Sequence, residues 1–178
     1  NYKEKINADF VYLPAPLDVK KFNNISEIEK KENQIIYIGR DSYEKGIDIL
    51  KNIEPKINGN VIYCTNLPWE KTMEILKSSS ILVIPSRMES IPQVIKEAFY
   101  LKIPVIATNV GGVHEIVENE ITGILIPPEN PKKMIEAIND LLDDDLLVDQ
   151  LTKNAFEFIT KNFTWDVLLS KYIELYEK

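Results

Sequence analysis

The sequence predicts an α/β fold in which helices cover both faces of a parallel sheet. Short apolar runs rich in Ile and Val recur along the chain, and segments with helical periodicity separate them. The runs are continuously apolar rather than alternating, which is typical of strands buried on both faces. The 178 residues, 44% of them hydrophobic, are enough for one compact α/β domain, or for one domain with an appended arm.

The elements can be assigned in chain order. Residues 10–22, "FVYLPAPLDVKKF", predict a short strand followed by a proline-bounded connection. Apolar runs then predict strands at 35–39, 60–64, 81–85, 103–107 and 123–127. Helical patterns follow these runs at 45–54, 69–78, 91–101, 112–118 and 131–142. Residues 145–178 predict two further helices, the second with Thr164 as its N-cap. This alternation of strand and helix predicts a doubly wound sheet.

Composition argues against several classes of function. The net charge of −7 disfavours nucleic acid or an anionic membrane surface as the main partner. A single Cys and a single His provide neither a disulfide framework nor a metal-ligand cluster. No signal peptide is visible and no apolar run reaches the roughly 18 residues of a membrane span. Neither GxGxxG nor GxxxxGK[ST] occurs, so NAD-dependent and P-loop chemistry lack sequence support. We expect a reducing, cytoplasmic location.

Two basic residues follow the first apolar strand. In a doubly wound sheet, ligands bind outside the carboxyl ends of the strands. Arg40 and Lys45 lie in such a loop, "GRDSYEKG". They could bind a phosphate, Arg40 through its planar fork and Lys45 as a point charge. From the loop alone, the alternative of two merely solvated cations remains open.

Two carboxylates flank a predicted helix start after the third apolar strand. In "RMESIPQVIKEA", Glu89 and Glu97 are eight positions apart. We expect a capping box between them, with Ser90 as N-cap, Gln93 reaching back and Pro92 in the first turn. Glu97 would then lie about two turns into the helix, and both carboxylates could face one crevice beside the free N–H groups of the helix start. A nucleotide sugar, with phosphates between two hydroxyl-bearing ends, fits this layout. Alternatively, Glu89 only complements the helix dipole and Glu97 is a solvated residue further along.

The ordered motifs resemble a known family. The run "ILVIPSRMESIPQVIKEAFYLKIPVIATNVGGVHEIVENEITGILIPPENPKKMIEAI" contains the E-x7-E element, the "PS" before its first Glu and the "TNVGG…EIV" segment. With the "GR…EKG" loop and the "FTWDVLLSKYIELY" tail, it resembles the C-terminal domain of the retaining glycosyltransferases of family 4, or glycosyl transferases group 1, which have the two-domain GT-B fold. The resemblance implies a Rossmann-like donor-binding domain over 21–144. It also implies an initial strand and interdomain connection over 1–20, and C-terminal helices over 145–178 that pack on the domain and turn back toward an N-terminal domain.

The resemblance implies a role for each candidate residue. Arg40 and Lys45 fall on the family's diphosphate-binding pair, and Glu89 falls on the Glu that contacts donor-sugar hydroxyls; these three are the expected catalytic residues. The expected donor-binding residues are Gly39, Arg40, Lys45, Cys64, Asn66, Glu89, Ser90, Ile91, Gln93, Val94 and Glu97. Among them, Glu97 would take the ribose hydroxyls, the backbone of 90–94 would hold sugar and phosphate, and the loop 64–67 would lie beside the nucleobase. Ser90 and Pro92 occupy positions where the family often has Gly. We interpret His114 as a solvated residue and Cys64 as an unreactive thiol.

The resemblance thus implies the donor-binding domain of a retaining, hexosyl-type glycosyltransferase. Its donor would be a UDP, GDP or ADP sugar, with no cofactor and no metal. Its partner would be an N-terminal acceptor-binding domain of the same protein, without which we expect no turnover. No contact with nucleic acid or membrane is expected of this chain, although the full-length protein could lie at the inner face of a membrane. Two alternatives remain open, a related GT-B enzyme such as a sugar-nucleotide epimerase and a non-catalytic nucleotide-sugar-binding subunit.

Overall fold

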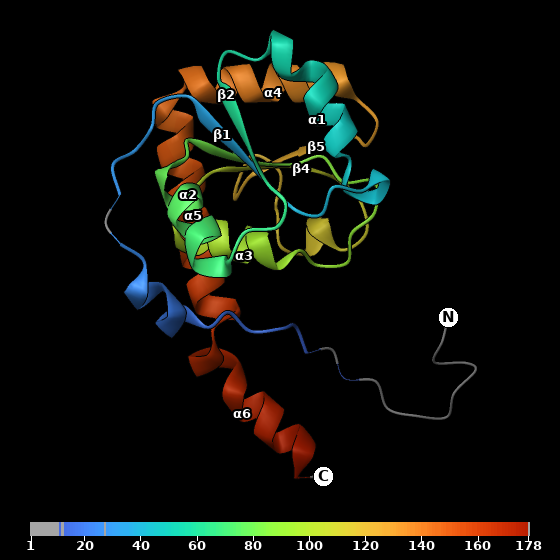
Figure 1. The fold of residues 1–178 in the computed structure, drawn as a ribbon. Coiled ribbons are helices and arrows are strands. Elements are labelled where there is room, and N and C mark those ends of the chain that lie inside the picture. The colour runs from blue at the N-terminus through green and yellow to red at the C-terminus, as the bar shows by residue number, and fades with distance from the viewer. Residues whose placement is uncertain (1–10, 12, 27, 178) are drawn as a thin grey trace, which may run out of the picture.

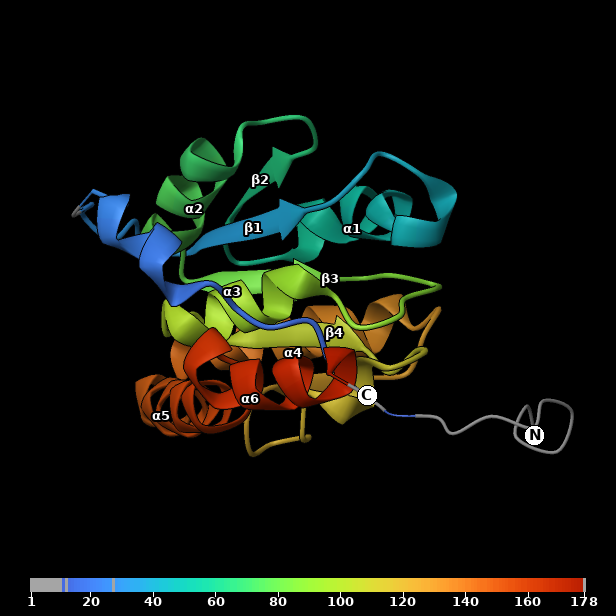
Figure 2. The ribbon, with the colours of Figure 1, turned by 90° about the horizontal axis from the view of Figure 1, so that it is seen from below.

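A parallel sheet forms the centre of the structure. The computed structural model describes residues 11, 13–26 and 28–177. Within this part of the chain the sheet has five strands in the order β2-β1-β3-β4-β5, all parallel (Figure 2). The strands are β1 (Gln34–Ile38), β2 (Asn60–Cys64), β3 (Ile81–Ile84), β4 (Val105–Thr108) and β5 (Ile124–Ile126). The predicted doubly wound sheet is confirmed, because the five strands predicted between residues 35 and 127 are all present.

Helices cover both faces of the sheet, as predicted (Figure 1). The helices are α1 (Ile47–Ile53), α2 (Trp69–Ser78), α3 (Gln93–Tyr100), α4 (Pro131–Asp143), α5 (Asp145–Asn162) and α6 (Trp165–Tyr176). Short 3-10 helices are η2 (Val19–Asn24), η3 (Tyr43–Lys45), η4 (Glu54–Lys56) and η5 (Val113–Glu115). Helices α1 and α4 pack on one face of the sheet, α2 and α3 pack on the other, and α5 packs against α3. No helix in the described ranges is long and apolar enough to cross a membrane.

Alternate residues of each strand supply the two halves of the core. Ile36 and Leu82 belong to the cluster that also contains the inner side chains of α2 and α3. Their neighbours Ile35 and Val83 belong to the cluster with α1 and α4. Successive side chains of a strand point to opposite faces, so a strand buried on both faces must be apolar throughout. This requirement explains the continuous apolar runs of the sequence.

The predicted first strand is wrong for the residues that the structure describes. Residues 13–16 have no regular structure, Leu17 makes a single parallel bridge with Thr164, and the 3-10 helix η2 follows. Pro14 and Pro16 carry no amide hydrogen, so a strand here would lack two donors. Positions 10 and 12 of this prediction lie outside the described residues.

Two predicted helices are shorter than expected. The helix predicted over 45–54 is divided into η3 and α1 by Gly46, which has φ +65°. A Cβ on Gly46 would lie 2.0 Å from the carbonyl oxygen of Pro85 in the loop after β3. Glycine is therefore required where these two loops meet. The helix predicted over 112–118 forms only the three residues of η5.

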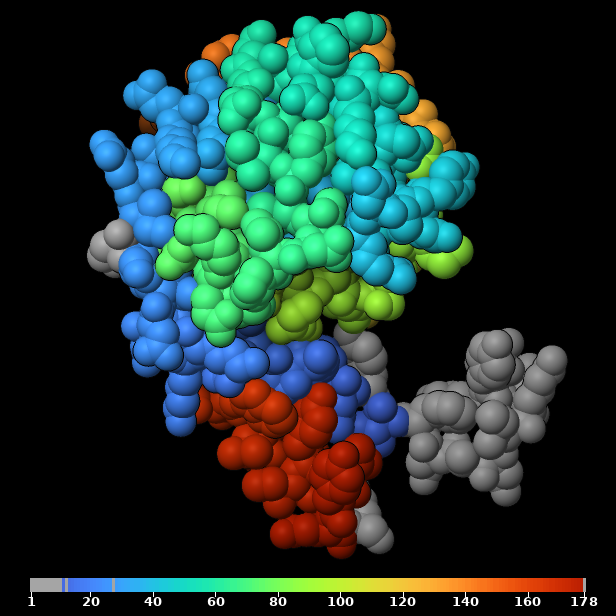
Figure 3. All heavy atoms as spheres, viewed as in Figure 1, coloured from blue at the N-terminus to red at the C-terminus, as the bar shows by residue number. Residues whose placement is uncertain are grey.

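The N-terminal segment, defined here as residues 13–24, lies against the junction of α5 and α6. The Leu17 amide donates to the Phe163 carbonyl at 2.6 Å, and the Trp165 amide donates to the Leu17 carbonyl at 3.4 Å. Tyr172 of α6 donates its hydroxyl to the Pro14 carbonyl at 3.2 Å. Figure 3 shows the N-terminal segment and α6 side by side below the body of the molecule. The division of the chain at residues 20 and 144 stays a prediction.

Candidate functional site

The candidate site lies where the strand order changes direction. The chain passes from β1 to β2 on one side and then places β3 on the other side of β1. The carboxyl ends of β1 and β3 therefore flank the switch point of the sheet, where open α/β sheets form a ligand crevice. The loop after β1 contains Arg40 and Lys45, and the loop after β3 contains Glu89. The fold thus brings two of the predicted loops to one place.

Lys45 and Glu89 form an ion pair across this switch point. The Lys45 ammonium lies 2.6 Å from Glu89 Oε1, and the Ser86 hydroxyl donates to the same oxygen at 2.8 Å. The Glu89 side chain is 8% exposed and the Lys45 side chain 25%. These two donors satisfy an oxygen of a carboxylate that has little access to water. The structure therefore joins two predicted catalytic residues directly. The "PS" motif of the sequence contains Ser86, but the sequence assigned it no role at the site.

The loop after β4 supports the backbone at Glu89. Gly111 has φ +53°, and a Cβ built there would lie 1.7 Å from the Glu89 carbonyl oxygen. The Gly112 amide donates to the Ser90 carbonyl at 2.8 Å, and a Cβ on Gly112 would lie 2.6 Å from that oxygen. The two glycines let this loop pack directly on the loop that holds Glu89.

The predicted capping box is wrong. Helix α3 begins at Gln93 with Pro92 as N-cap, and no side chain caps it. Pro92 disfavours helical backbone at the preceding residue, so Ser90 and Ile91 stay outside the helix. The Gln93 side chain accepts from the Lys96 ammonium at 3.1 Å instead of reaching back. Glu97 consequently lies about one turn into the helix rather than two.

Glu97 is held by a tryptophan of the neighbouring helix. The Trp69 indole Nε1 donates to Glu97 Oε1 at 2.8 Å. Burial raises the pKa of Glu97, while the Trp69 hydrogen bond and the charges of Lys21 and Lys96 lower it. The hydrogen bonds of Glu97 and those of Glu89 go to different partners. Trp69 was not identified from the sequence, since the two residues are 28 positions apart and meet only when α2 packs beside α3.

The remaining predicted residues differ in how exposed they are and in which hydrogen bonds they make. The Arg40 side chain is exposed, while its carbonyl accepts from the buried Tyr37 hydroxyl at 2.7 Å. The Gly39 amide donates to the Cys64 carbonyl at 3.2 Å, which joins the ends of β1 and β2. Burial raises the pKa of the Cys64 thiol, in agreement with an unreactive role. Asn66, Ser90 and His114 are exposed, and Ile91 and Val94 are half-buried.

Two cations that sequence analysis missed lie beside the site. Arg87, in the loop after β3, contacts Asp48 and Glu129. Lys96 of α3 is 1% exposed and donates to the Ala15 carbonyl at 2.6 Å. Arg87 follows a predicted strand just as Arg40 does, so its position alone could have identified it as a candidate site residue. Lys96 has no such signal, because it lies within a predicted helix and its partners are the Ala15 carbonyl and the Gln93 side chain. Among the described residues, no three His, Cys, Asp or Glu side chains gather as a metal site requires.

Comparisons with known proteins bear on the family and the fold. Residues 50–158 match the glycosyl transferases group 1 family. An uncharacterized glycosyltransferase of Methanocaldococcus jannaschii is 24% identical over 84% of this chain and 46% of its own length. The structure of sucrose-phosphate synthase from Thermosynechococcus elongatus superposes with a TM-score of 0.80 at 22% identity, over 92% of this chain and 51% of that one. HepE of Anabaena in complex with UDP-glucose superposes with a TM-score of 0.74 at 18% identity, over 82% and 49%.

The chain spans about half the length of each of these three proteins. The structural matches establish the fold, and the family match covers more than half of the chain. The chain therefore has the fold of the C-terminal domain of a GT-B glycosyltransferase, and it belongs to the glycosyl transferases group 1 family.

Proposed function

We propose that this chain binds the nucleoside diphosphate sugar of a retaining, hexosyl-type glycosyltransferase between the loops after β1 and β3. The observation that carries the proposal is the Lys45–Glu89 pair, 2.6 Å apart at the switch point of the sheet. A cation beside a buried carboxylate suits a ligand in which a phosphate and a hydroxyl-bearing sugar are adjacent. Lys45 would bind the phosphate oxygens and Glu89 the sugar hydroxyls.

In the proposed reaction the leaving group is a nucleoside diphosphate. Negative charge grows on its phosphate nearest the sugar as the glycosidic bond breaks. Lys45 and the exposed guanidinium of Arg40 would stabilise this charge, and such electrostatic stabilisation is often the largest contribution to catalysis. Glu89 would orient the sugar through its hydroxyls. No covalent intermediate with the protein is required.

The nucleoside end of the donor would lie toward Glu97. Trp69 occupies one lone pair of Glu97 Oε1, so Oε2 can accept from the ribose hydroxyls. The loop 64–67 at the end of β2 would border the nucleobase. Uridine is the first candidate among UDP, GDP and ADP sugars, because the structure of HepE was solved with UDP-glucose.

A second domain would complete the active site. Helix α6 exposes a series of large apolar side chains, namely Trp165, Val167, Leu169, Ile173, Leu175 and Tyr176. We propose that an N-terminal domain of the same protein contacts this helix, brings the acceptor and closes over the donor in the cytoplasm. The chain alone would bind donor and give no acceptor-dependent turnover, because positioning of the acceptor supplies about 7–11 kcal/mol of catalysis.

Calorimetry tests the donor proposal. The chain is titrated with UDP-glucose, GDP-glucose and ADP-glucose and with the three free nucleosides. We expect one base to be preferred, the diphosphate sugar to bind more tightly than its nucleoside, and Lys45→Ala to remove most of that difference. Lys133→Ala is a matched control, since Lys133 forms an exposed ion pair with Glu136 on α4. Absence of binding by all six ligands, or equal affinities for the parent and Lys45→Ala, would contradict the proposal.

A further inference from the structure

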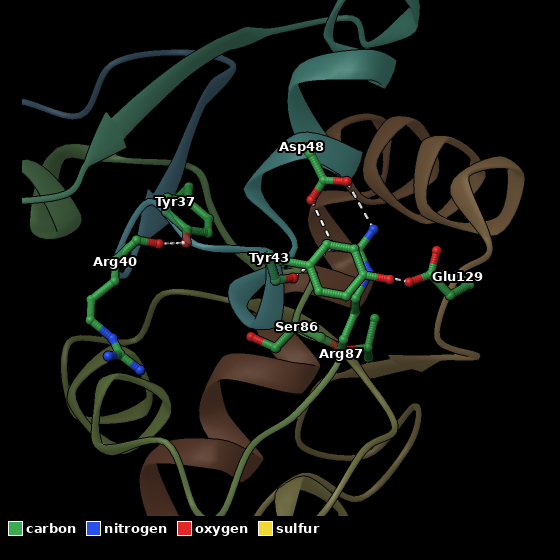
Figure 4. A network of polar contacts seen from close by, with 8 residues as sticks. Tyr37, Arg40, Tyr43, Asp48, Ser86, Arg87 and Glu129 are labelled. Atoms are coloured by element: carbon green, nitrogen blue, oxygen red, sulfur yellow. Dashed lines mark hydrogen bonds and ion pairs between the residues drawn. The ribbon is translucent and has the colours of Figure 1, made fainter.

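Arg87 connects three loops at the carboxyl edge of the sheet (Figure 4). Its guanidinium donates to both carboxylate oxygens of Asp48, at 2.7 and 2.8 Å. Nη1 also donates to the Tyr43 carbonyl at 2.7 Å, and Nε donates to Glu129 in the loop after β5. The planar group lies 3.9 Å from the centre of the Tyr43 ring. One side chain thereby joins η3 and α1 to the loops after β3 and β5.

The main chain makes the same connection. The Arg87 amide donates to the Glu44 carbonyl at 2.8 Å, and the Met88 amide lies 3.3 Å from the same oxygen. Glu44 immediately precedes Lys45, and Met88 immediately precedes Glu89. The contacts of Arg87 therefore join the residues adjacent to the two members of the Lys45–Glu89 pair. A shift between η3 and the loop after β3 would break the Arg87 contacts and the 2.6 Å pair together.

The Arg87 network differs from an ordinary surface ion pair. The Arg87 side chain is 14% exposed, although its partners Asp48 and Glu129 are 49% and 58% exposed. Most of the guanidinium donors are used, in a bidentate fork and two further bonds, and the ring of Tyr43 covers one face. Lysine offers no such planar fork, so it cannot reproduce this geometry.

We propose that Arg87 is a positioning residue for donor binding, which holds η3 against the loop after β3 so that Lys45 and Glu89 reach the diphosphate and the sugar of one donor. This inference rests on the proposed function. The hydrogen bonds of the Arg87 guanidinium go to Asp48, Glu129 and the Tyr43 carbonyl, so we assign it no direct contact with the donor. Its effect on the donor passes through Lys45.

The test compares Arg87→Lys, Arg87→Ala and Asp48→Asn with the parent chain. Calorimetry gives the affinity for the preferred nucleoside diphosphate and for its nucleoside, and thermal unfolding reports on the fold. We expect Arg87→Lys, despite its retained charge, to weaken diphosphate binding about tenfold while nucleoside binding and the unfolding temperature change little. Asp48→Asn, which keeps one acceptor for Arg87, should weaken diphosphate binding in the same direction but less. The exposed pair of Lys51 with Asp41 supplies the control Lys51→Ala, which should leave all three measurements unchanged.

A double mutant separates positioning from general damage. If Arg87 acts through Lys45, adding Arg87→Lys to Lys45→Ala weakens diphosphate binding no further than Lys45→Ala alone. Three results would overturn the inference. The losses of affinity could be additive in the double mutant, Arg87→Lys could lose nucleoside and diphosphate affinity equally, or Arg87→Lys could keep the parental affinity. Different results would contradict the proposed function, namely a parent chain that binds no nucleotide or a Lys45→Ala variant with parental affinity. This inference would then fail as well, because it rests on that function.

Discussion

The indole of Trp69 and the carboxylate of Glu97 form a 2.8 Å hydrogen bond between two neighbouring helices. This bond fixes one oxygen of a half-buried carboxylate and lowers its pKa, which burial raises. Trp69→Phe removes the donor and keeps most of the ring volume. We expect nucleotide binding to weaken by about 0.5–1.5 kcal/mol, measured by calorimetry. Unchanged affinity would mean that Glu97 needs no fixed orientation.

The pH dependence of nucleotide binding should follow Glu97. Its folded-state pKa is raised above 4.5, mainly by burial. Since the ribose hydroxyls are expected to bind the carboxylate form, affinity should fall as the pH is lowered through this raised pKa. Glu97→Gln keeps an acceptor for Trp69 but loses the titration, so its weaker binding should vary less with pH over the same window. Parallel pH profiles for the two proteins would assign the titration to another group.

Stability should change with pH in the opposite sense. Between about 4.5 and the raised pKa of Glu97, the folded chain retains a proton that the unfolded chain has lost. The contribution of Glu97 to the free energy of unfolding therefore falls as the pH rises through that window. This contribution is greatest at pH values below the window. We expect Glu97→Gln to gain stability relative to the parent as the pH rises from 4 to 7, measured by urea unfolding at each pH. A constant difference between the two proteins would contradict this expectation.

Lys45→Ala and Arg40→Ala should differ in stability. Removal of Lys45 leaves the 8% exposed Glu89 side chain with the Ser86 hydroxyl and without its cation. We expect a loss of about 1–3 kcal/mol in the free energy of unfolding for Lys45→Ala. The Arg40 side chain is exposed, so Arg40→Ala should change that free energy by less than about 0.5 kcal/mol. Both variants should weaken diphosphate binding, and denaturant titration separates the two effects.

Lys96 should control the attachment of the N-terminal segment. Its buried ammonium donates to the Ala15 carbonyl, two residues before Leu17. Lys96→Met fills similar space without a donor, so the Ala15 carbonyl loses its partner. Hydrogen exchange of the Leu17 amide, which is bonded to Phe163, should become faster, while amides of β3 keep the parental rate. Parental exchange at Leu17 would show that its own hydrogen bonds suffice.

The central fold could be predicted because it depends on local pattern. Strands buried on both faces must be apolar throughout, so runs such as "ILVI" and "IIYI" were recognisable. One boundary that failed depends on a partner far along the chain. Gly46 divides a predicted helix because it meets the Pro85 carbonyl, and sequence position does not reveal that contact.

The candidate site was predictable to a different degree at each residue. Lys45 and Glu89 were identified by their places after strands and by family motifs, and the structure joins them. Trp69 and Lys96 contact residues far along the chain, and these contacts leave no periodic or charge signal in the sequence. Ser86 lies in the recognised "PS" motif, but the motif did not reveal its hydrogen bond to Glu89. The capping box failed because Pro92 excludes the preceding residues from the helix, a restriction that outweighed the suitable side chains of Ser90 and Gln93.

The hydrogen bonds of Leu17 to Phe163 and Trp165 join the N-terminal segment to the junction of α5 and α6, so two distant parts of the chain meet there. A body joined ahead of residue 13 would be attached where α6 also departs. If the N-terminal domain that we propose precedes residue 13, its connection and α6 would leave the sheet domain side by side, and a rotation between the two domains would have its axis near Leu17.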